Sequence, residues 1–255
     1  MPNQPYLLLE TTWKTVKQTD YEVVVLPWGA IEAHNLHLPY GTDAMQSEAI
    51  AAESARIAWE KGAKVIVLPT VPFGVNTGQM KVRLDINMHP STQLAVVRDV
   101  AESLSFQGFK KLVVLNGHGG NEFKPIVREL QVRFLELSVC LVNWYTVVDP
   151  ALFFEDTGEH GSEMETSILL HLAPHLVLPM DEAGRGVVHP FRIRALKDGW
   201  AWTPRDWLKA TEDTGIGDPE KASAEKGRKY LAAVTEKIGA FLYDYAKTDL
   251  KSFYE

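Results

Sequence analysis

The chain has 255 residues, of which 45% are hydrophobic and 23% are charged, and its formal net charge is −7. This is an ordinary globular composition with enough residues for a sizeable core, and the negative charge offers no general attraction to nucleic acid or to an anionic membrane. The single cysteine, Cys140, excludes an internal disulfide and fits a reducing compartment. No signal-peptide pattern and no apolar run of about 20 residues is present, so we expect a cytoplasmic protein without a membrane span.

Strand-like and helix-like segments alternate over the first 144 residues. The strands are short apolar runs, expected at 23–26, 65–68, 112–115 and 138–144. The helices between them are expected at 43–61, 91–107 and 122–135. Apolar strands that alternate with helices are typical of a parallel sheet covered on both faces. We therefore predict an α/β fold with a mainly parallel central sheet.

The last third of the chain is less regular. Helices are expected at 162–172 and 219–247. Ser162 and Glu165 fit a capping box at the start of the first of these helices. Residues 185–218 are rich in glycine, proline and tryptophan, so we expect a long structured excursion of the kind that covers a site or a subunit contact. No repeat and no linker composition divides the chain, and we predict a single domain over residues 1–255.

Two carboxylates and two histidines follow the first strand within twelve residues: Glu32, His34, His37 and Asp43. Carboxylate oxygens together with imidazole nitrogens suit zinc, manganese or iron better than calcium. Glu32 and His34 are two residues apart, so in an extended segment their side chains leave on the same face. Asp43 has an alternative interpretation as a helix cap, with Gln46 completing a capping box.

A second segment, N-G-H-G-G-N at 116–121, places His118 among glycines after the third expected strand. Glycines let the backbone bring an imidazole close to a bound group. Alternatives are a solvent-facing turn and a phosphate cradle, but the lysine and hydroxyl of the usual phosphate-binding loop are absent. Loops that follow parallel strands lie on one edge of a sheet, where ligands bind. Both histidine-bearing loops are therefore expected on the same edge.

A third segment, G-E-H-G-S-E-M-E-T-S at 158–167, surrounds the start of the expected helix 162–172. The positive end of a helix stabilises carboxylates such as Glu163 and Glu165. The same dipole disfavours the charged form of His160. A neutral histidine at this place suits proton transfer or metal ligation.

Together the three segments resemble the creatininase family, creatinine amidohydrolase and its relatives. The family pattern is a strand followed by G-x-x-E-x-H-G-x-H-L-P-x-x-T-D, then N-G-H, then E/D-x-H-A/G-G-x-x-E-T-S. The resemblance runs from about residue 23 to residue 227, with the motifs in the family's order. It implies a three-layer α/β/α fold, a centre of two divalent metal ions, and hydrolysis of a C–N bond in a cyclic or linear amide. It also implies a homo-oligomer, commonly a hexamer.

The resemblance assigns a role to particular residues of this chain. The implied metal ligands are Glu32, His34, Asp43 and His118, with Asp43 bridging the two ions. His160 matches the family's catalytic histidine, and Glu159 matches the acidic residue beside it. In the implied reaction a hydroxide bridging the ions attacks the amide carbon, and His160 passes a proton to the leaving nitrogen. Zinc is the first choice for the ions, with manganese or iron as alternatives.

Two departures from the family pattern concern the site. Creatinine-hydrolysing members carry a ligand glutamate two residues after the N-G-H histidine, where this chain has Gly120. We expect Glu163 to supply the missing carboxylate. Asn35 stands where the family usually has glycine, so creatinine itself is not the expected substrate. Two rival functions stay open: a deformylase or peptidase-like hydrolase acting on a different amide, and a non-catalytic protein that binds a small molecule.

Overall fold

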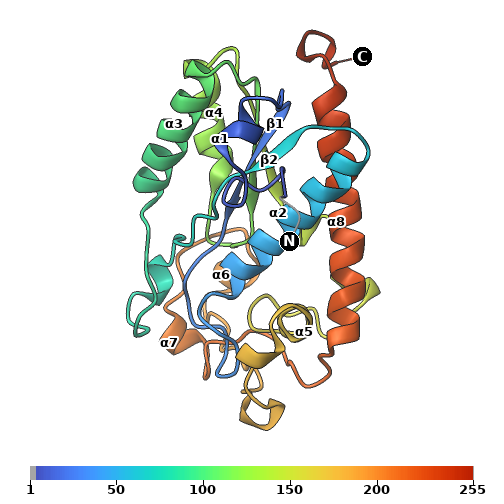
Figure 1. Cartoon of the computed structure of the whole chain (residues 1–255). Coiled ribbons are helices and arrows are strands. Elements are labelled where there is room, and N and C mark those ends of the chain that lie inside the picture. Colours follow the sequence, from blue (N-terminus) through green and yellow to red (C-terminus); the bar gives the residue numbers. More distant parts are fainter. Residues whose placement is uncertain (1–3, 255) are drawn as a thin grey trace.

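The computed structural model describes residues 4–254 of the chain, and a parallel sheet lies at its centre (Figure 1). The four strands pair in the order β2-β1-β3-β4, and every pairing is parallel. Their bounds are β1 (Val23–Trp28), β2 (Val65–Val67), β3 (Lys111–Asn116) and β4 (Ser138–Asn143). The predicted parallel sheet is therefore confirmed, with all four strands close to their expected places.

The two central strands are buried along their whole length because both faces of the sheet are covered. Side chains alternate along β1, so Val23 and Val25 join one hydrophobic core and Val24 and Leu26 join the other. One core packs under α2 (Thr42–Glu60), α5 (Glu163–Leu172) and α8 (Ala224–Lys247). The other packs under α3 (Pro90–Phe106) and α4 (Phe123–Arg133). This is the three-layer α/β/α arrangement that the resemblance implied.

Two helix starts differ from the sequence-based expectation. Helix α2 has Gly41 at its N-cap and no side-chain cap, so the interpretation of Asp43 as a capping residue is wrong. Helix α5 begins after Ser162, whose hydroxyl has no hydrogen-bond partner within residues 4–254, so the predicted capping box is not formed. The Glu165 carboxylate instead accepts a hydrogen bond from the backbone N–H of Gly161 at 2.5 Å. Both acidic side chains are thus directed to other partners.

The excursion at 185–218 is built from turns and two short helices, as its glycine and proline content predicted. The shorter helical elements of the described chain are α1 (Trp13–Val16), α6 (Arg194–Lys197), α7 (Trp207–Ala210), η1 (Thr77–Gln79), η2 (Trp144–Thr146), η3 (Pro150–Leu152), η4 (Pro174–Leu176), η5 (Met180–Glu182) and η6 (Leu250–Ser252), where η denotes a 3-10 helix. Helix α7 contacts η1, so the excursion packs against a loop that belongs to the first half of the chain.

Among residues 4–254, no helix combines the length and the apolar character that a membrane span requires.

Candidate metal centre

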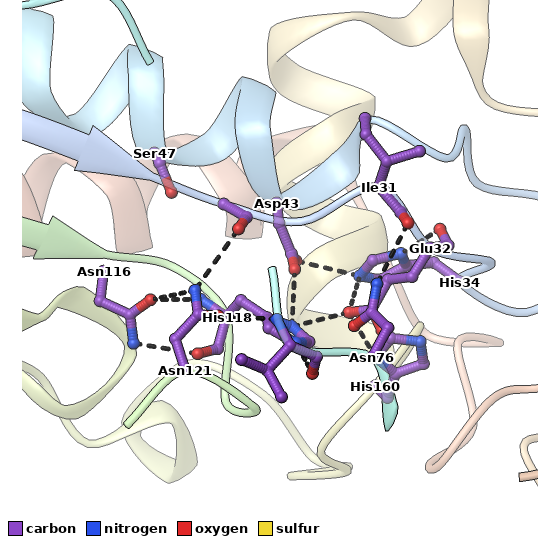
Figure 2. Close-up of polar contacts among 12 residues, drawn as sticks. Ile31, Glu32, His34, Asp43, Ser47, Asn76, Asn116, His118, Asn121 and His160 are labelled. Atoms are coloured by element: carbon purple, nitrogen blue, oxygen red, sulfur yellow. Dashed lines mark hydrogen bonds and ion pairs between the residues drawn. The ribbon is translucent and has the colours of Figure 1, made fainter. Parts of the chain in front are cut away.

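Six acidic and histidine side chains converge beyond the carboxyl ends of β1 and β3, and Figure 2 shows most of them. They come from the loop after β1, the first turn of α2, the loop after β3, the segment that leads into α5, and the first turn of α5. The six residues are Glu32, His34, Asp43, His118, His160 and Glu165, and none is more than 7% exposed. The two histidine-bearing loops therefore share one edge of the sheet, as their positions after parallel strands predicted.

Asp43 lies at the middle of this cluster. Its Oδ1 atom is 3.0 Å from His34 Nε2, and its Oδ2 atom is 3.1 Å from His118 Nδ1 (Figure 2). Glu32 Oε1 lies 2.9 Å from the same nitrogen of His118, and Glu165 Oε1 lies 3.8 Å from His34 Nε2. Each oxygen of one aspartate thus faces a different histidine, and each histidine has a second carboxylate beside it.

The histidine rings are held by backbone carbonyls on their far side. His34 Nδ1 lies 3.1 Å from the carbonyl oxygen of Glu32, and His118 Nε2 lies 3.1 Å from that of Val75. His160 Nε2 lies 2.8 Å from the carbonyl oxygen of Ala33. A carbonyl only accepts hydrogen bonds, so the proton of each neutral ring sits on that nitrogen. The nitrogen that faces the carboxylates is then left with a lone pair, which is the arrangement of a metal-ligating histidine.

Two buried oxygens of the cluster have only histidine nitrogens as close polar neighbours, at 2.9 and 3.1 Å from His118 Nδ1. Glu32 Oε1 and Asp43 Oδ2 are fully buried and make no hydrogen bond with the described residues. A buried carboxylate is costly unless a positive partner balances it, and a protonated histidine or a metal cation can be that partner. The donor set of carboxylates and imidazoles fits a divalent transition metal, so the residues present fit the ions that the family resemblance implies.

The opposite charges of the cluster raise the pKa values of His34 and His118 and lower those of Glu32 and Asp43. Burial lowers the pKa of His34, but Asp43 and Glu165 outweigh burial and raise that pKa to about 10. The pKa of His118 is also raised, because Glu32 and Asp43 outweigh burial there. Burial raises the pKa of Glu32 and of Asp43, but the histidines outweigh it and lower both. Protons on His34 and His118 balance the carboxylates, and a divalent cation would displace those protons.

Three sets of side chains bring their ligand atoms within 4.8 Å of one another: Glu32–Asp43–His118, His34–Asp43–Glu165 and Glu32–His34–His160. The first two sets share Asp43, which offers a different oxygen to each. The third set contains His160, whose ring stacks on His34 with the ring centres 4.0 Å apart. Asp43 therefore lies between two groups of side chains, each of which could hold a metal ion.

The structure places Glu163, the expected replacement ligand, away from this cluster. Its carboxylate accepts hydrogen bonds from Lys226 and from the backbone N–H groups of Glu155, at 2.9 Å, and Asp156, at 2.8 Å. Glu163 and Glu165 are two positions apart on α5, and a helix turns about 200° over two residues, so only one of them faces the cluster. Glu165 is the one that does. The E-T-S end of the third motif was the signal that could have identified it.

The surroundings of Gly120 leave no room for the glutamate that creatinine-hydrolysing members carry at this position. A Cβ atom at Gly120 would lie 2.4 Å from the carbonyl oxygen of Val75 and 2.5 Å from His118 Nε2. These two atoms form the contact that holds the His118 ring, so a glutamate at position 120 would disrupt it. The loop after β3 has no room for a second ligand here.

The other predicted site residues have distinct surroundings. Glu159 lies at the surface, with its side chain 67% exposed, and its carboxylate accepts from both terminal nitrogens of Arg205 at 3.0 Å. His37 is buried beside the cluster and its Nε2 lies 2.8 Å from Thr166 Oγ1. Burial lowers the pKa of His37 to about 4, so this ring is neutral at pH 7. His37 therefore joins the loop after β1 to α5.

Asn35 fastens Gly184, the residue just before the excursion, to the loop that carries Glu32 and His34. Its backbone has φ of 57°, a left-handed conformation that asparagine adopts more readily than other non-glycine residues. Its amide nitrogen donates to the carbonyl oxygen of Gly184, and its amide oxygen accepts from the Gly184 N–H, both at 2.8 Å. The departure from the family pattern at this position thus replaces a glycine by a side chain that binds the segment leading into the excursion.

The fold and the buried cluster define an α/β protein with a candidate metal centre at the carboxyl edge of a parallel sheet. The family described as creatininase, creatinine amidohydrolase, matches residues 9–242, and the chain belongs to that family.

Three similar proteins carry two different activities in their names. A solved structure from Bacteroides fragilis NCTC 9343, proposed to be a creatinine amidohydrolase, is 42% identical, has a TM-score of 0.93, and covers 99% of this chain and 100% of its own. The creatinine amidohydrolase of Pseudomonas putida is 28% identical over 90% of this chain and 93% of its own length. The mycofactocin precursor peptide peptidase of Mycobacterium tuberculosis H37Rv is 27% identical over 84% of this chain and 81% of its own.

Solved creatininase structures also show which metals the fold accommodates. One creatininase variant, described as a Zn-Zn type, is 26% identical, has a TM-score of 0.74, and covers 95% of this chain and 99% of its own. Another structure of the same fold is described as a manganese form of creatininase. Both amidohydrolases and peptidases are hydrolases, so the relatives support an enzyme of that class.

Proposed function

We propose that this protein is a metal-dependent hydrolase that cleaves a C–N bond in a small amide other than creatinine. The observation that carries this proposal is the placement of the two oxygens of Asp43 against two histidines whose far nitrogens are held by backbone carbonyls. The similarity to both an amidohydrolase and a peptidase supports a C–N bond as the target.

In this proposal the ligand residues fall into two sets, one for each of two adjacent ions. Glu32, Asp43 and His118 would hold one ion, and His34, Asp43 and Glu165 would hold the other. Zinc is our first choice for both, and manganese or iron are the alternatives. When bound, two such ions lower the pKa of a water molecule towards neutrality and polarise a carbonyl group.

His160 is the group we assign to proton transfer. Its Nε2 is held by the carbonyl oxygen of Ala33 at 2.8 Å, while its Nδ1 faces the cluster at 3.8 Å from Glu32 Oε1. Burial, helped by the neighbouring His34, lowers the pKa of His160 to about 4, so the ring is neutral at pH 7 and can accept a proton at Nδ1. It can then deliver that proton to the nitrogen that leaves.

The excursion covers the site in a way that favours small substrates. Trp207 packs against His160 with ring centres 4.8 Å apart, and Ile216 exchanges two backbone hydrogen bonds with His160 at 2.7 and 3.1 Å. The cluster is almost fully buried under this cover, and exclusion of water strengthens its electrostatic interactions. A short peptide-type bond is the second candidate substrate, and the similarity to peptidases favours it.

Metal content per chain is the measurement that tests the proposed function. Elemental analysis of protein purified without chelator should give about two transition-metal ions per chain. His34→Ala should lower that number, whereas His175→Ala, which removes an exposed histidine on η4, should leave it unchanged. Metal-loaded protein should then be assayed on creatinine, N-formyl compounds, cyclic amides and short peptides. A wild-type chain that binds no metal even when supplied with it would overturn the hydrolase proposal and favour a non-catalytic binding protein.

Location and assembly belong to the same proposal. We propose a cytoplasmic homo-oligomer, a hexamer by family resemblance, that acts on a small-molecule amide and binds neither nucleic acid nor membrane. Size-exclusion chromatography with light scattering measures the subunit number directly, and a monomer would contradict this part of the proposal.

A further inference from the structure

We propose that Gln79 is a positioning residue that holds one oxygen of Glu32, so that the other oxygen faces the candidate metal centre. This inference rests on the proposed function, because it assigns Gln79 a role towards a residue that would bind metal. No family motif of the sequence includes Gln79, and it lies 47 positions from Glu32 along the chain.

The contact itself is direct and buried. The side-chain nitrogen of Gln79 donates a hydrogen bond to Glu32 Oε2. Gln79 is 3% exposed and Glu32 is 1% exposed, so water does not compete for this bond. The remaining oxygen, Glu32 Oε1, makes no hydrogen bond with the described residues and lies 2.9 Å from His118 Nδ1. One oxygen of Glu32 is therefore held by the Gln79 amide, and the other faces the cluster.

A rigid turn carries the amide to this place. Gln79 ends η1, where its N–H donates to the carbonyl oxygen of Asn76 at 2.9 Å, and its own carbonyl oxygen accepts from Val82 at 2.8 Å. The side-chain nitrogen of Asn76 donates to the carbonyl oxygen of Ile31 at 3.1 Å, directly before Glu32 (Figure 2). The same turn thus binds the backbone beside Glu32 and the Glu32 carboxylate, which fixes one relative to the other.

The excursion closes over this turn. A Cβ atom at Gly78 would lie 2.1 Å from the carbonyl oxygen of Arg205 and 3.0 Å from Trp207 Cδ1, so only glycine permits the observed packing. Trp207 in turn contacts His160. The turn that holds Glu32 is therefore enclosed between the cluster and its cover, and this enclosure keeps the Gln79 amide dry.

A glutamine amide suits this role chemically. It donates a hydrogen bond without carrying a charge, so it orients the carboxylate without competing with a cation for it. Partners that orient a ligand residue in this way change metal affinity by about 10–100-fold when they are removed. We therefore expect the effect of Gln79 to fall on the ion that Glu32, Asp43 and His118 would hold, and not on its neighbour.

The experiment measures the dissociation constants for zinc by competition with a chromophoric chelator. Gln79→Leu removes the donor while keeping a similar volume, and it should weaken binding of one of two ions by about 10–100-fold. Gln93→Leu is the matched control, since Gln93 is also buried and donates at 2.7 Å to Asn121, a neutral amide that is not among the proposed ligands. Gln93→Leu should leave both constants unchanged.

The same measurement in a second variant, which lacks the carboxylate of Glu165, identifies which ion is affected. In Glu165→Gln only the ion held by Glu32, Asp43 and His118 should bind, and adding Gln79→Leu should weaken that remaining ion by the same factor. Should Gln79→Leu fail to fold, Gln79→Asn keeps the amide but is one methylene too short to reach Glu32, and it should show the same weakening.

The outcomes separate the inference from the proposed function. Unchanged constants in a folded Gln79 variant, with two ions bound by the wild type, would overturn the role of Gln79 and leave the proposed metal centre standing. Wild-type protein that takes up no zinc would overturn both. Weakening of both ions equally in the Gln79 and Gln93 variants would show a general loss of structure and would also reject the positioning role.

Discussion

Two groups of acidic side chains lie near the start of α5, and they are balanced in opposite ways. One group contains Glu165 and belongs to the buried cluster, where the carboxylates face histidines. The other contains Glu163, which is also fully buried but is held by Lys226 and by two backbone N–H groups. Two oxygens of the first group, Glu32 Oε1 and Asp43 Oδ2, have only histidine nitrogens beside them, whereas both oxygens of Glu163 accept hydrogen bonds from an ammonium group or from backbone N–H groups.

This contrast shows that acidic composition does not mark a metal site by itself. A buried carboxylate that already has an ammonium group and N–H donors is satisfied and has no use for a metal ion. A carboxylate that faces only imidazoles must share protons with them or bind a cation. Glu163 and Glu165 are only two residues apart on α5, so the direction in which each side chain leaves the helix decides its role.

The largest expected effect comes from removing the residue shared by both proposed ions. Asp43→Ala should abolish binding of both metals and all hydrolysis, because each ion would lose a ligand. His34 and His118 would also lose the carboxylate that lies between them. Elemental analysis of the purified variant measures this. His160→Ala is the informative partner variant, and we expect it to keep the metals and lose turnover. Metal and activity retained in Asp43→Ala would refute the bridging role.

The two glutamates of α5 give the sharpest test of the comparison. Glu165→Gln should lose one of two ions with little change in stability, since burial already raises the pKa of Glu165 to about 7 and its neutral form is tolerated. Glu163→Gln should keep both ions but lose about 1–3 kcal/mol of unfolding free energy, because Lys226 would lose its charged partner. Metal content and urea unfolding measure the two effects. Loss of metal in Glu163→Gln instead would restore the expectation from the sequence.

The sequence predicted the sheet and most of the cluster for different reasons. All four strands were found because each is a short apolar run between helices, although β1 extends to Trp28 because Pro27 and Trp28 still pair with β3. All six residues of the cluster lie in motifs that follow strands or start a helix, so their meeting at one edge followed from topology. Five of them were predicted as site residues, and Glu163 was expected in the place of Glu165. Gln79 could not be predicted, because its contact with Glu32 depends on how a distant turn packs.

A smaller effect should be seen in how the unfolding free energy depends on pH, because two neighbouring histidines have very different pKa values. His37 faces Thr166 and burial lowers its pKa to about 4, whereas His34 faces carboxylates that raise its pKa to about 10. Between pH 6.5 and 4 the unfolded chain binds a proton at His37 and the folded chain does not. The unfolding free energy should therefore fall as the pH is lowered through this window, by about 1–3 kcal/mol from His37 alone.

The measurement is urea unfolding of the chelator-treated protein at pH 7, 6, 5 and 4, with His37→Asn beside the wild type. Asparagine keeps a polar side chain near Thr166 but does not titrate in this range. The wild-type curve should fall more steeply than that of the variant, and parallel curves would show that the His37 ring is already protonated or exposed in the folded chain.

The smallest expected effect is that of Glu159, which lies next to His160 in sequence but outside the cluster. Its exposed ion pair with Arg205 should contribute only about 0.2–1 kcal/mol, so Glu159→Gln should fold normally. Because the carboxylate is directed to Arg205 rather than to the His160 ring, we expect kcat to fall far less than in His160→Ala. If the two variants lost activity equally, Glu159 would have to turn from Arg205 towards the site during the reaction, and its catalytic assignment by resemblance would stand. A small loss would instead confine proton transfer to His160 and leave Glu159 with the task of tying the excursion to the segment before α5.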